Sequence, residues 1–245
     1  MGDYELKHFA DAAGLVRGAA EDWVELVRTS PKEKPFCVAL SGGRIAPLLF
    51  SNFASRVRAE RVDLGSVHFF WSDERCVPPS SPESNFRAAW EQLLGPLQVP
   101  ERQIHRIQGE LPPGAATEQA AADLRTVCEA EAPNTPSLQL VLLGMGEDGH
   151  VASLFPGESD ALVRDSLIYR AVTASKPPPL RVTLGYSVIA AAGEVWVLVS
   201  GAGKGVALSR SLKQGGTPLG RVLSLRQNTR IYSDLTRLEK KPGTT

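Results

Sequence analysis

The sequence predicts a three-layer α/β/α fold, in which a mostly parallel sheet lies between helices on both of its faces. Three observations support this prediction. Short runs such as FCVAL (36–40) and LQLVLLG (138–144) are almost wholly apolar, as expected for strands buried on both faces. Amphipathic segments with helical spacing separate these runs. With 245 residues, 42% of them hydrophobic, the chain is long enough for one large domain with a sizeable core.

The first half of the chain alternates the two kinds of segment. The segment 84–95 also carries boundary signals, because Ser84 or Asn85 can cap a helix start and Gly95 can end the helix. The expected elements are a helix over 10–30, a strand over 36–40, a helix over 46–59, a strand over 67–74, a helix over 84–95 and a short strand over 103–108.

The second half continues the alternation, without internal repeats or low-complexity tracts. Its expected elements are a long helix over 116–132, strands over 138–144, 167–172 and 181–185, a helix over 187–192, a strand over 194–201, a helix over 204–212 and a strand near 229–234. Apolar strands that alternate with helices are typical of a Rossmann-like sheet. No linker is long enough to divide the chain, so residues 1–245 are expected to form a single domain.

Composition narrows the classes of function. Lys and Arg together number 27, as do Asp and Glu, so the zero net charge gives no reason to expect a nucleic-acid partner. The three widely spaced cysteines favour reduced thiols in a cytosol, and they lack paired zinc-ligand spacing. We see no signal peptide and no apolar run near the ~20 residues that cross a bilayer. The sequence therefore predicts a soluble cytoplasmic protein without a membrane partner.

Polar loops follow four of the expected strands. In a parallel sheet, ligands bind outside the carboxyl ends of the strands, so these loops are the first place to look for a site. We expect them to converge on one cleft. They are Ser41–Arg44, Ser72–Arg75, Gly144–His150 and Ser200–Lys204.

The third loop contains G-x-G-x-x-G, the spacing of a dinucleotide-binding loop, at 144–149. Asp148 would place a negative charge beside the phosphates, and the following SLFPG interrupts the helix that such a loop should open. Asp165 precedes the next strand instead of ending it. We therefore favour a loop that presents His150, a polar side chain that packing does not explain. His8, His68 and His105 are expected to be structural or solvated.

Two further segments imitate known motifs. GAGKG (201–205) lacks the first glycine of a Walker A loop, because Leu198 stands in its place. ALSGG (39–43) resembles a nucleophile elbow with alanine in the first position. A serine hydrolase that uses Ser41, an acid and His150 is one interpretation. We favour the other, in which Ser41 begins a glycine-rich loop whose N–H groups bind an anion.

Several motifs together resemble one family. LGMGEDGHVASLFPG resembles the signature loop of the 6-phosphogluconolactonases, and ALSGGRIAP, FFWSDERCVPPSSPESNF, PPPLRVTLG and GAGKGVAL occur in that family's order, from about Phe36 to Lys204. Glucosamine-6-phosphate deaminases share the fold but typically carry Asn-Glu-Pro after the histidine loop and an aromatic residue after Asp-Glu. This chain has Ser153–Pro156 and Arg75 there, which favours the lactonase branch. Arg44 departs from the lactonase pattern, in which Ser or Thr follows the two glycines.

The resemblance implies hydrolysis of 6-phospho-D-glucono-1,5-lactone to 6-phosphogluconate in the oxidative branch of the pentose phosphate pathway. Because an activated ester needs less help than an amide, neither a metal nor a covalent nucleophile is required, and no cofactor is expected. His150 is the expected general base, oriented by Asp148 or by a backbone carbonyl. Arg75 is the expected group that stabilises developing negative charge or orients the lactone. The expected substrate-binding residues are Ser41, Gly42, Gly43, Arg44, Asp73, Asn85, Gly149, Arg181 and Lys204.

Two alternatives remain open. One is a deaminase or isomerase of the same fold that acts on glucosamine 6-phosphate, and the other is a non-catalytic sugar-phosphate-binding module. The expected partner is a small sugar-phosphate lactone, and the chain is expected to be a monomer or a weak homo-oligomer.

Overall fold

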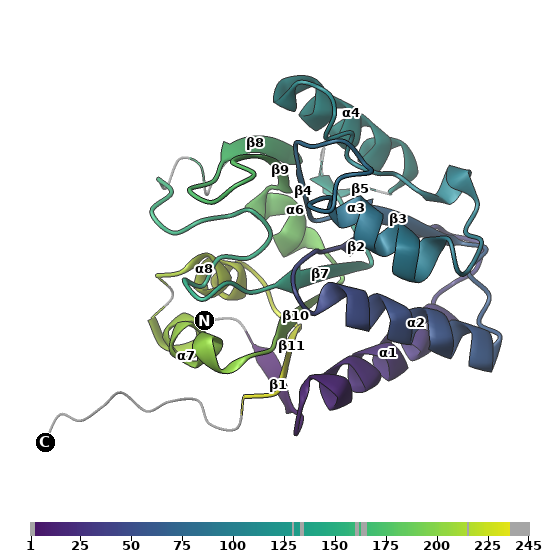
Figure 1. The fold of residues 1–245 in the computed structure, drawn as a ribbon, viewed down its shortest axis with the longest axis horizontal. Coiled ribbons are helices and arrows are strands. Elements are labelled where there is room, and N and C mark those ends of the chain that lie inside the picture. The colour runs from purple at the N-terminus through teal and green to yellow at the C-terminus, as the bar shows by residue number, and fades with distance from the viewer. Residues whose placement is uncertain are drawn as a thin grey trace, which may run out of the picture.

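A six-stranded sheet forms the centre of the computed structural model, which describes residues 3–128, 130–132, 135–159, 162, 166–214 and 216–235 (Figure 1). All of its strand pairs are parallel. The spatial order is β1 (Tyr4–His8), β11 (Thr229–Ser233), β10 (Glu194–Val199), β7 (Leu140–Gly144), β2 (Phe36–Leu40) and β3 (Val67–Trp71). The predicted three-layer, mostly parallel α/β/α fold is confirmed.

Helices cover both faces of this sheet. On one face lie α1 (Ala12–Thr29), α2 (Ala46–Glu60) and α3 (Asn85–Ala89), and on the other lie α6 (Tyr186–Ala191), α7 (Gly205–Gln214) and α8 (Pro218–Leu225) (Figure 1). Asp11 caps α1 by accepting the N–H of Gly14, and α1 ends before Pro31 as predicted. Within the described residues, no helix has the length and apolar character needed to cross a membrane.

A smaller antiparallel sheet stands beside the carboxyl end of β3. It consists of β4 (Asp73–Arg75), β9 (Leu180–Leu184) and β8 (Tyr169–Thr173), and α4 (Pro113–Val127) packs against it. The predicted single strand over 67–74 is therefore wrong. Ser72 ends the parallel sheet by donating its N–H to Leu40 O (2.7 Å), while its own carbonyl accepts the N–H of Leu184 in the second sheet (2.8 Å).

Other expected elements differ in detail. The segment 84–95 begins at the cap Ser84 as predicted, but after α3 it continues as a π-helical turn, η1 (Trp90–Leu94). The expected strand over 103–108 is only a single bridge from Ile104 to Phe69, preceded by the short helix η2 (Glu101–Gln103). The helix predicted over 116–132 starts earlier and ends earlier, as α4. It is followed by a short hairpin of β5 (Ala130–Ala132) and β6 (Thr135–Pro136).

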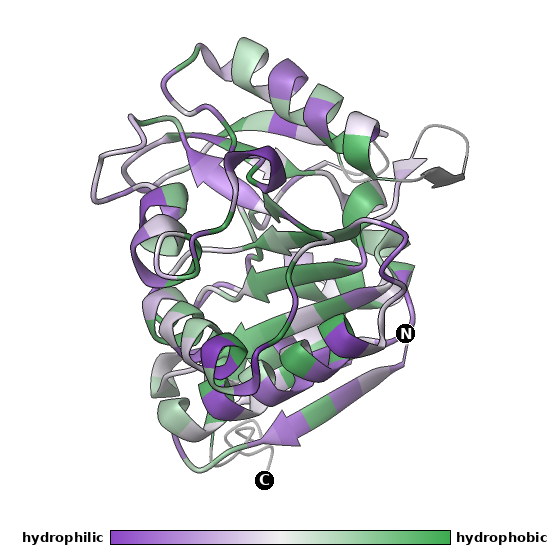
Figure 2. Cartoon of the chain, turned by 90° about the vertical axis from the view of Figure 1, so that its right-hand side faces the viewer, coloured by the Kyte–Doolittle hydropathy of each residue, from purple (hydrophilic) through white to green (hydrophobic). Residues whose placement is uncertain are grey.

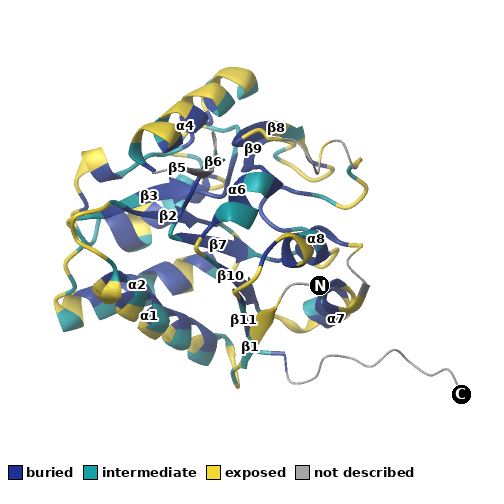
Figure 3. Cartoon of the chain, turned by 180° about the vertical axis from the view of Figure 1, so that it is seen from behind, coloured by how far each residue is buried: buried dark blue, intermediate teal, exposed yellow. Residues whose placement is uncertain are grey.

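The core lies where the central strands meet the helices. All five residues of β2 are buried, as are the first four of β7, which explains their nearly continuous apolar sequences. The central strands are strongly hydrophobic, whereas the edge strand β1 is mixed (Figure 2). Burial follows the same pattern, with exposed residues on the outer faces of the helices (Figure 3). The carboxyl ends of the parallel strands all open toward one side, where polar loops replace the core.

Candidate active site

The four polar loops expected from the sequence meet in one cleft of about 100 Å³ at the carboxyl ends of the parallel strands. Ten of the twelve expected site residues line it. The other two, Asp148 and Gly149, do not, but Asp148 is hydrogen-bonded to the lining residue His150 and Gly149 precedes His150 in the chain. Ile45 and Ala152 lie outside the four expected loops, whereas Gly144 and Met145 belong to the third loop but were not named as site residues. The lining consists of Ser41, Gly42, Gly43, Arg44, Ile45, Asp73, Arg75, Asn85, Gly144, Met145, His150, Ala152, Arg181 and Lys204.

His150 is held by Asp148. The Asp148 carboxylate accepts the imidazole Nδ1 at 2.6 Å and the backbone N–H of His150 at 3.1 Å. Burial opposes ionisation of Asp148, but the hydrogen bonds and charge of His150 lower its pKa below the ordinary value. Because an ionised carboxylate only accepts, Nδ1 must carry the proton, which leaves Nε2 unprotonated in the neutral ring. This is the tautomer that a general base needs.

A tight turn brings these two residues together. The N–H of Gly146 donates to His150 O (2.9 Å), and the N–H of Gly149 donates to Gly146 O (3.0 Å). Gly149 has φ +83°, a left-handed conformation that favours glycine. A Cβ atom on Gly146 would lie 2.1 Å from the His150 ring and 2.7 Å from Asp148 Oδ1. The glycines of this loop thus make room for an imidazole and its carboxylate.

The same turn argues against a dinucleotide-binding loop. Among the described residues 145–159 there is no helix, so the loop does not open the expected βαβ unit. The next described strand, β8, belongs to the antiparallel sheet. Asp165 lies outside the described residues. The G-x-G-x-x-G spacing here serves to place His150 at the end of β7.

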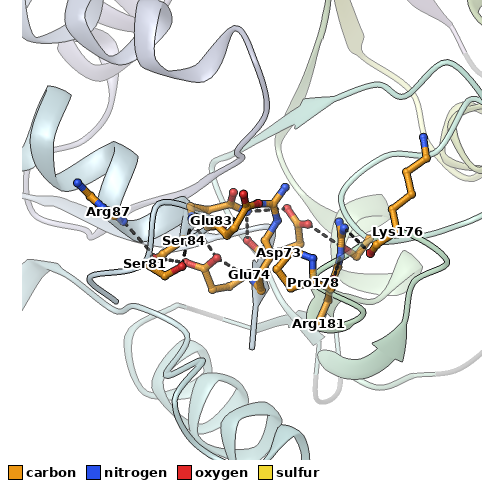
Figure 4. A network of polar contacts seen from close by, with 12 residues as sticks. Asp73, Glu74, Ser81, Glu83, Ser84, Arg87, Lys176, Pro178 and Arg181 are labelled. Carbon is orange, nitrogen blue, oxygen red and sulfur yellow. Dashed lines mark hydrogen bonds and ion pairs between the residues drawn. The ribbon is translucent and has the colours of Figure 1, made fainter. Parts of the chain in front are cut away.

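Two arginines form a positively charged wall of the cleft. Arg75 on β4 and Arg181 on β9 face each other as an antiparallel pair. Arg75 donates to Glu83 O (2.6 Å), whereas Arg181 donates to the carbonyls of Pro178 (3.1 Å) and Lys176 (3.4 Å) (Figure 4). Burial and the charge of Arg75 lower the pKa of Arg181, but a guanidinium stays protonated. Two like charges held this close favour an anionic ligand.

Asp73 and Asn85 connect three segments of the cleft through hydrogen bonds and packing. Asn85 Nδ2 donates to Asp73 O (2.8 Å), and Asp73 Oδ2 accepts the hydroxyl of Ser153 (2.7 Å). A Cβ atom on Gly42 would lie 1.8 Å from Asn85 Oδ1, so the amide packs directly on the glycine-rich loop. Both side chains are buried and hydrogen-bonded within the protein, and both also line the cleft.

Glu74 anchors this region and was not expected as part of the site. Its carboxylate accepts the backbone N–H groups of Arg75 (2.7 Å), Asn85 (2.8 Å) and Phe86 (2.8 Å), and the hydroxyl of Ser84 (2.9 Å) (Figure 4). Burial raises its pKa, and the four donors act in the opposite direction. Glu74 thereby joins β4 to the start of α3 and sets the positions of Arg75 and Asn85.

The loop after β2 presents backbone groups to the cleft. Gly43 has φ +100°, and its carbonyl accepts the N–H of Ala46 (3.1 Å) at the start of α2. The hydroxyl of Ser41 accepts the N–H of Gly144 (3.4 Å), which connects this loop to β7. A glycine-rich loop that leads into a helix start is suited to an anion.

Two cations from different loops line the cleft, Arg44 after β2 and Lys204 after β10. Arg44 is 83% exposed, and its Nη2 lies 3.6 Å from Glu147 Oε1. Lys204, from the short helix η3 (Ala202–Lys204), is close enough that burial and the charge of Arg44 lower its pKa, while Asp234 and Glu147 raise it. Arg44 is thus directed toward Glu147 on the histidine loop.

The comparisons with known proteins agree with one another. The model of the family described as glucosamine-6-phosphate isomerases/6-phosphogluconolactonase matches residues 10–231. A probable chloroplastic 6-phosphogluconolactonase 3 from Oryza sativa subsp. indica is 34% identical over 194 residues, which cover 75% of this chain and 58% of the rice protein. The chain thus spans less than two thirds of that relative.

Two further relatives are covered over most of their length. The 6-phosphogluconolactonase of Mycobacterium leprae is 32% identical over 218 residues, 86% of this chain and 85% of that protein. The structure of 6-phosphogluconolactonase from Trypanosoma brucei has a TM-score of 0.82 at 26% identity, covering 95% of this chain and 97% of that one. Because the family model spans most of the chain and includes every loop of the cleft, the chain belongs to the glucosamine-6-phosphate isomerase/6-phosphogluconolactonase family.

Proposed function

We propose that the chain hydrolyses 6-phospho-D-glucono-1,5-lactone to 6-phosphogluconate, the lactone step of the oxidative pentose phosphate pathway. The observation that carries this proposal is the Asp148–His150 pair beside the arginine wall of the same cleft. A lactone hydrolase needs a base for water and a positive charge for the oxyanion, and this cleft supplies both. The lactonases among the relatives support the choice of substrate.

In the proposed reaction, Nε2 of His150 takes a proton from water as the water oxygen bonds to the lactone carbonyl carbon. The carbonyl electrons move to oxygen, and Arg75 stabilises the resulting oxyanion. As the tetrahedral intermediate collapses, the bond to the ring oxygen breaks and the imidazolium returns its proton to that oxygen. Asp148 keeps the ring in one tautomer and stabilises its positive charge. The proposed step uses neither a metal, a cofactor nor a covalent enzyme intermediate.

We further infer that the phosphate binds at the start of α2. The N–H groups of Ser41, Gly42 and Gly43, together with the charges of Arg44, Arg181 and Lys204, would hold it there. Asp73, Asn85 and Gly149 would then contact or shape the space for the sugar part. The position of these residues around one cleft supports the assignment.

We also infer a cytoplasmic location and a single domain over residues 1–245. The three cysteines are free thiols, as favoured by a reducing compartment. The zero net charge supports the absence of a nucleic-acid partner. We propose that the chain works as a monomer or weak homo-oligomer, away from membranes.

A coupled assay tests the activity. Freshly generated 6-phosphogluconolactone is supplied, the spontaneous hydrolysis rate is subtracted, and ammonia release from glucosamine 6-phosphate is measured in parallel. Lactone hydrolysis above the spontaneous rate, lost in His150→Ala, supports the proposal. Ammonia release without lactonase activity overturns it in favour of a deaminase, and 6-phosphogluconate binding without either activity favours a sugar-phosphate-binding module.

A further inference from the structure

Phe155 contacts two of the residues to which the proposed reaction assigns roles. Its ring centroid lies 5.1 Å from that of His150, with the two planes inclined by 50°. The Arg181 guanidinium carbon lies 5.8 Å from the same ring centroid. Phe155 does not line the cleft, and it follows the fully buried Leu154. It is therefore a half-buried aromatic ring outside the cleft lining that contacts both His150 and Arg181.

The charge of Arg181 is subject to opposing influences, because burial and Arg75 lower its pKa while the carboxylates of Asp73 and Glu83 raise it. Arg181 as a whole residue is only 8% exposed, and it pairs with the second cation, Arg75, between strands β4 and β9. Its Nε and Nη2 donate to the carbonyls of Pro178 and Lys176, respectively. The negative face of an aromatic ring attracts a guanidinium most strongly where water is excluded. The Phe155 ring therefore helps to keep this charge in place against the repulsion of Arg75.

His150 needs a second constraint for a geometric reason. Its hydrogen bond to Asp148 fixes Nδ1, but a single bond at one ring atom leaves the plane of the imidazole free to tilt. The inclined ring of Phe155 restricts this tilt from the side. Together the two contacts determine where Nε2 points, and a base must lie within hydrogen-bond reach of the proton that it takes.

We propose that Phe155 is a positioning residue that sets His150 and Arg181 in a common geometry. The proposal rests on the proposed lactonase reaction, in which His150 determines the chemical step and Arg181 contributes to substrate binding. The coupling predicts that loss of the aromatic ring changes kcat and KM together. A residue that only stabilised the fold would lower the melting temperature and leave both constants unchanged.

The kinetic test compares Phe155→Leu with Phe155→Tyr, which keeps the aromatic face. Phe9→Leu is the matched control, because the half-buried Phe9 also stacks on another ring, Tyr232, at 6.2 Å between centroids and does not line the cleft. From the usual worth of an arginine–aromatic contact that is partly shielded from water, we expect Phe155→Leu to lower kcat and raise KM by about 5- to 30-fold each. Phe155→Tyr and Phe9→Leu should stay within about twofold of the parent, a limit that we set below the smallest expected effect.

A second measurement tests the contact without any activity. The chain has four histidines, so the His150 ring signals in a proton–carbon spectrum can be identified by their loss in His150→Asn. The aromatic ring of Phe155 shifts these signals. Phe155→Leu should move them toward their free-histidine positions, whereas Phe155→Tyr and Phe9→Leu should not. If Phe155→Leu does not fold, Phe155→Met, which fills a similar space with a flexible side chain, replaces it in both experiments.

The outcomes separate the two proposals. If the parent does not hydrolyse the lactone, the proposed function fails, and the spectrum together with calorimetric binding of 6-phosphogluconate still tests Phe155. Unchanged His150 signals in a folded Phe155→Leu overturn the positioning role. Values of kcat and KM within twofold of an active parent also overturn it, as does a change in only one of them.

Discussion

Asp148 Oδ1 accepts hydrogen bonds from both the Nδ1 and the backbone N–H of His150, at 2.6 and 3.1 Å. One carboxylate oxygen therefore fixes the ring and the main chain of the same residue. The hydrogen bonds and charge of His150 lower the pKa of Asp148, so the carboxylate stays ionised at the pH values at which neutral His150 can act as a base. We propose that this pair supplies the general base of the cleft, and the first two predictions concern it.

Replacement of His150 by alanine should lower kcat by ~10²-fold or more, as expected when a general base is lost. Asp148→Asn should have a smaller effect, because the base remains but its tautomer and orientation are no longer fixed. Steady-state kinetics with the lactone, corrected for spontaneous hydrolysis, measure both. A folded His150→Ala variant that hydrolyses the lactone at the parental rate would contradict the assignment.

Gly146→Ala should displace His150 even though Gly146 itself is not proposed to contact the substrate. Its Cβ atom would overlap the His150 ring at 2.1 Å, so the imidazole must leave its position beside Asp148. We expect kcat to fall by ~10²-fold, as for loss of the base itself. Gly114→Ala is the control, since a Cβ there meets nothing within 4 Å and alanine favours its helix. Equal activity of Gly146→Ala and the parent would show that His150 tolerates the displacement.

Ser41→Ala should retain most of the parental kcat. The serine is buried at the end of β2, where its hydroxyl accepts the N–H of Gly144, and the proposed reaction forms no bond to it. A fluorophosphonate, which labels activated serines, should therefore leave Ser41 unmodified. Mass spectrometry after incubation checks this. A stoichiometric adduct on Ser41 would instead support the serine-hydrolase interpretation of the ALSGG segment.

Arg44→Ser, which restores the residue usual in the lactonases, should weaken 6-phosphogluconate binding. A charged hydrogen bond to phosphate contributes ~1.5–3 kcal/mol, or roughly 10- to 150-fold in affinity, and we expect the lower end because Arg44 is 83% exposed. Glu147→Gln should act in the opposite direction, because it removes the carboxylate that lies 3.6 Å from Arg44. Calorimetry at fixed ionic strength measures both variants.

The controls for Arg44 use an unphosphorylated ligand. Gluconate should bind poorly to the parent and to both variants, because the arginine is proposed to contact only the phosphate. If Arg44→Ser binds 6-phosphogluconate as tightly as the parent, Arg44 is not a ligand and the loop N–H groups with Lys204 and Arg181 suffice. The lactonase proposal does not depend on this result.

His105 should make the fold sensitive to mild acid. Burial, together with the charge of His68, lowers its pKa to about 4 from 6.5, and the ring stacks on Phe70 and lies 2.9 Å from His68 Nδ1. Between pH 6.5 and about 4 the unfolded chain binds a proton that folded His105 does not. The free energy of unfolding should therefore decrease as the pH falls through this window, with no such loss above it.

The variant His105→Phe, which keeps the stacking on Phe70, should lose less stability between pH 7 and pH 5 than the parent. Urea unfolding at both pH values measures the difference. The same decrease in variant and parent would mean that other groups cause the acid sensitivity.

The sequence alone predicted that helices cover both faces of a mostly parallel sheet, and that four polar loops meet at one edge of it. The continuous apolar runs of β2, β7 and β10 and the amphipathic α1 and α2 are local patterns, and burial on both faces of a sheet leaves few other interpretations. Because parallel strands end at the same edge, the four polar loops had to meet there. The edge strand β1 was missed, since it is short and its exposed residues interrupt the apolar pattern.

Tertiary structure alone decided which side chains face one another within the cleft. The sequence pattern of 67–74 shows no break at Ser72. The strand divides between two sheets there only because Ser72 bonds Leu40 in one sheet and Leu184 in the other. That division sets Arg75 opposite Arg181, 106 residues apart in the chain by their numbering, and makes the positive wall. The contacts of Phe155 with His150 and Arg181 arise in the same way. The period of apolar residues indicates which face of a helix or strand is buried. Which other element packs against that face depends on contacts far apart in the sequence, which no local pattern specifies.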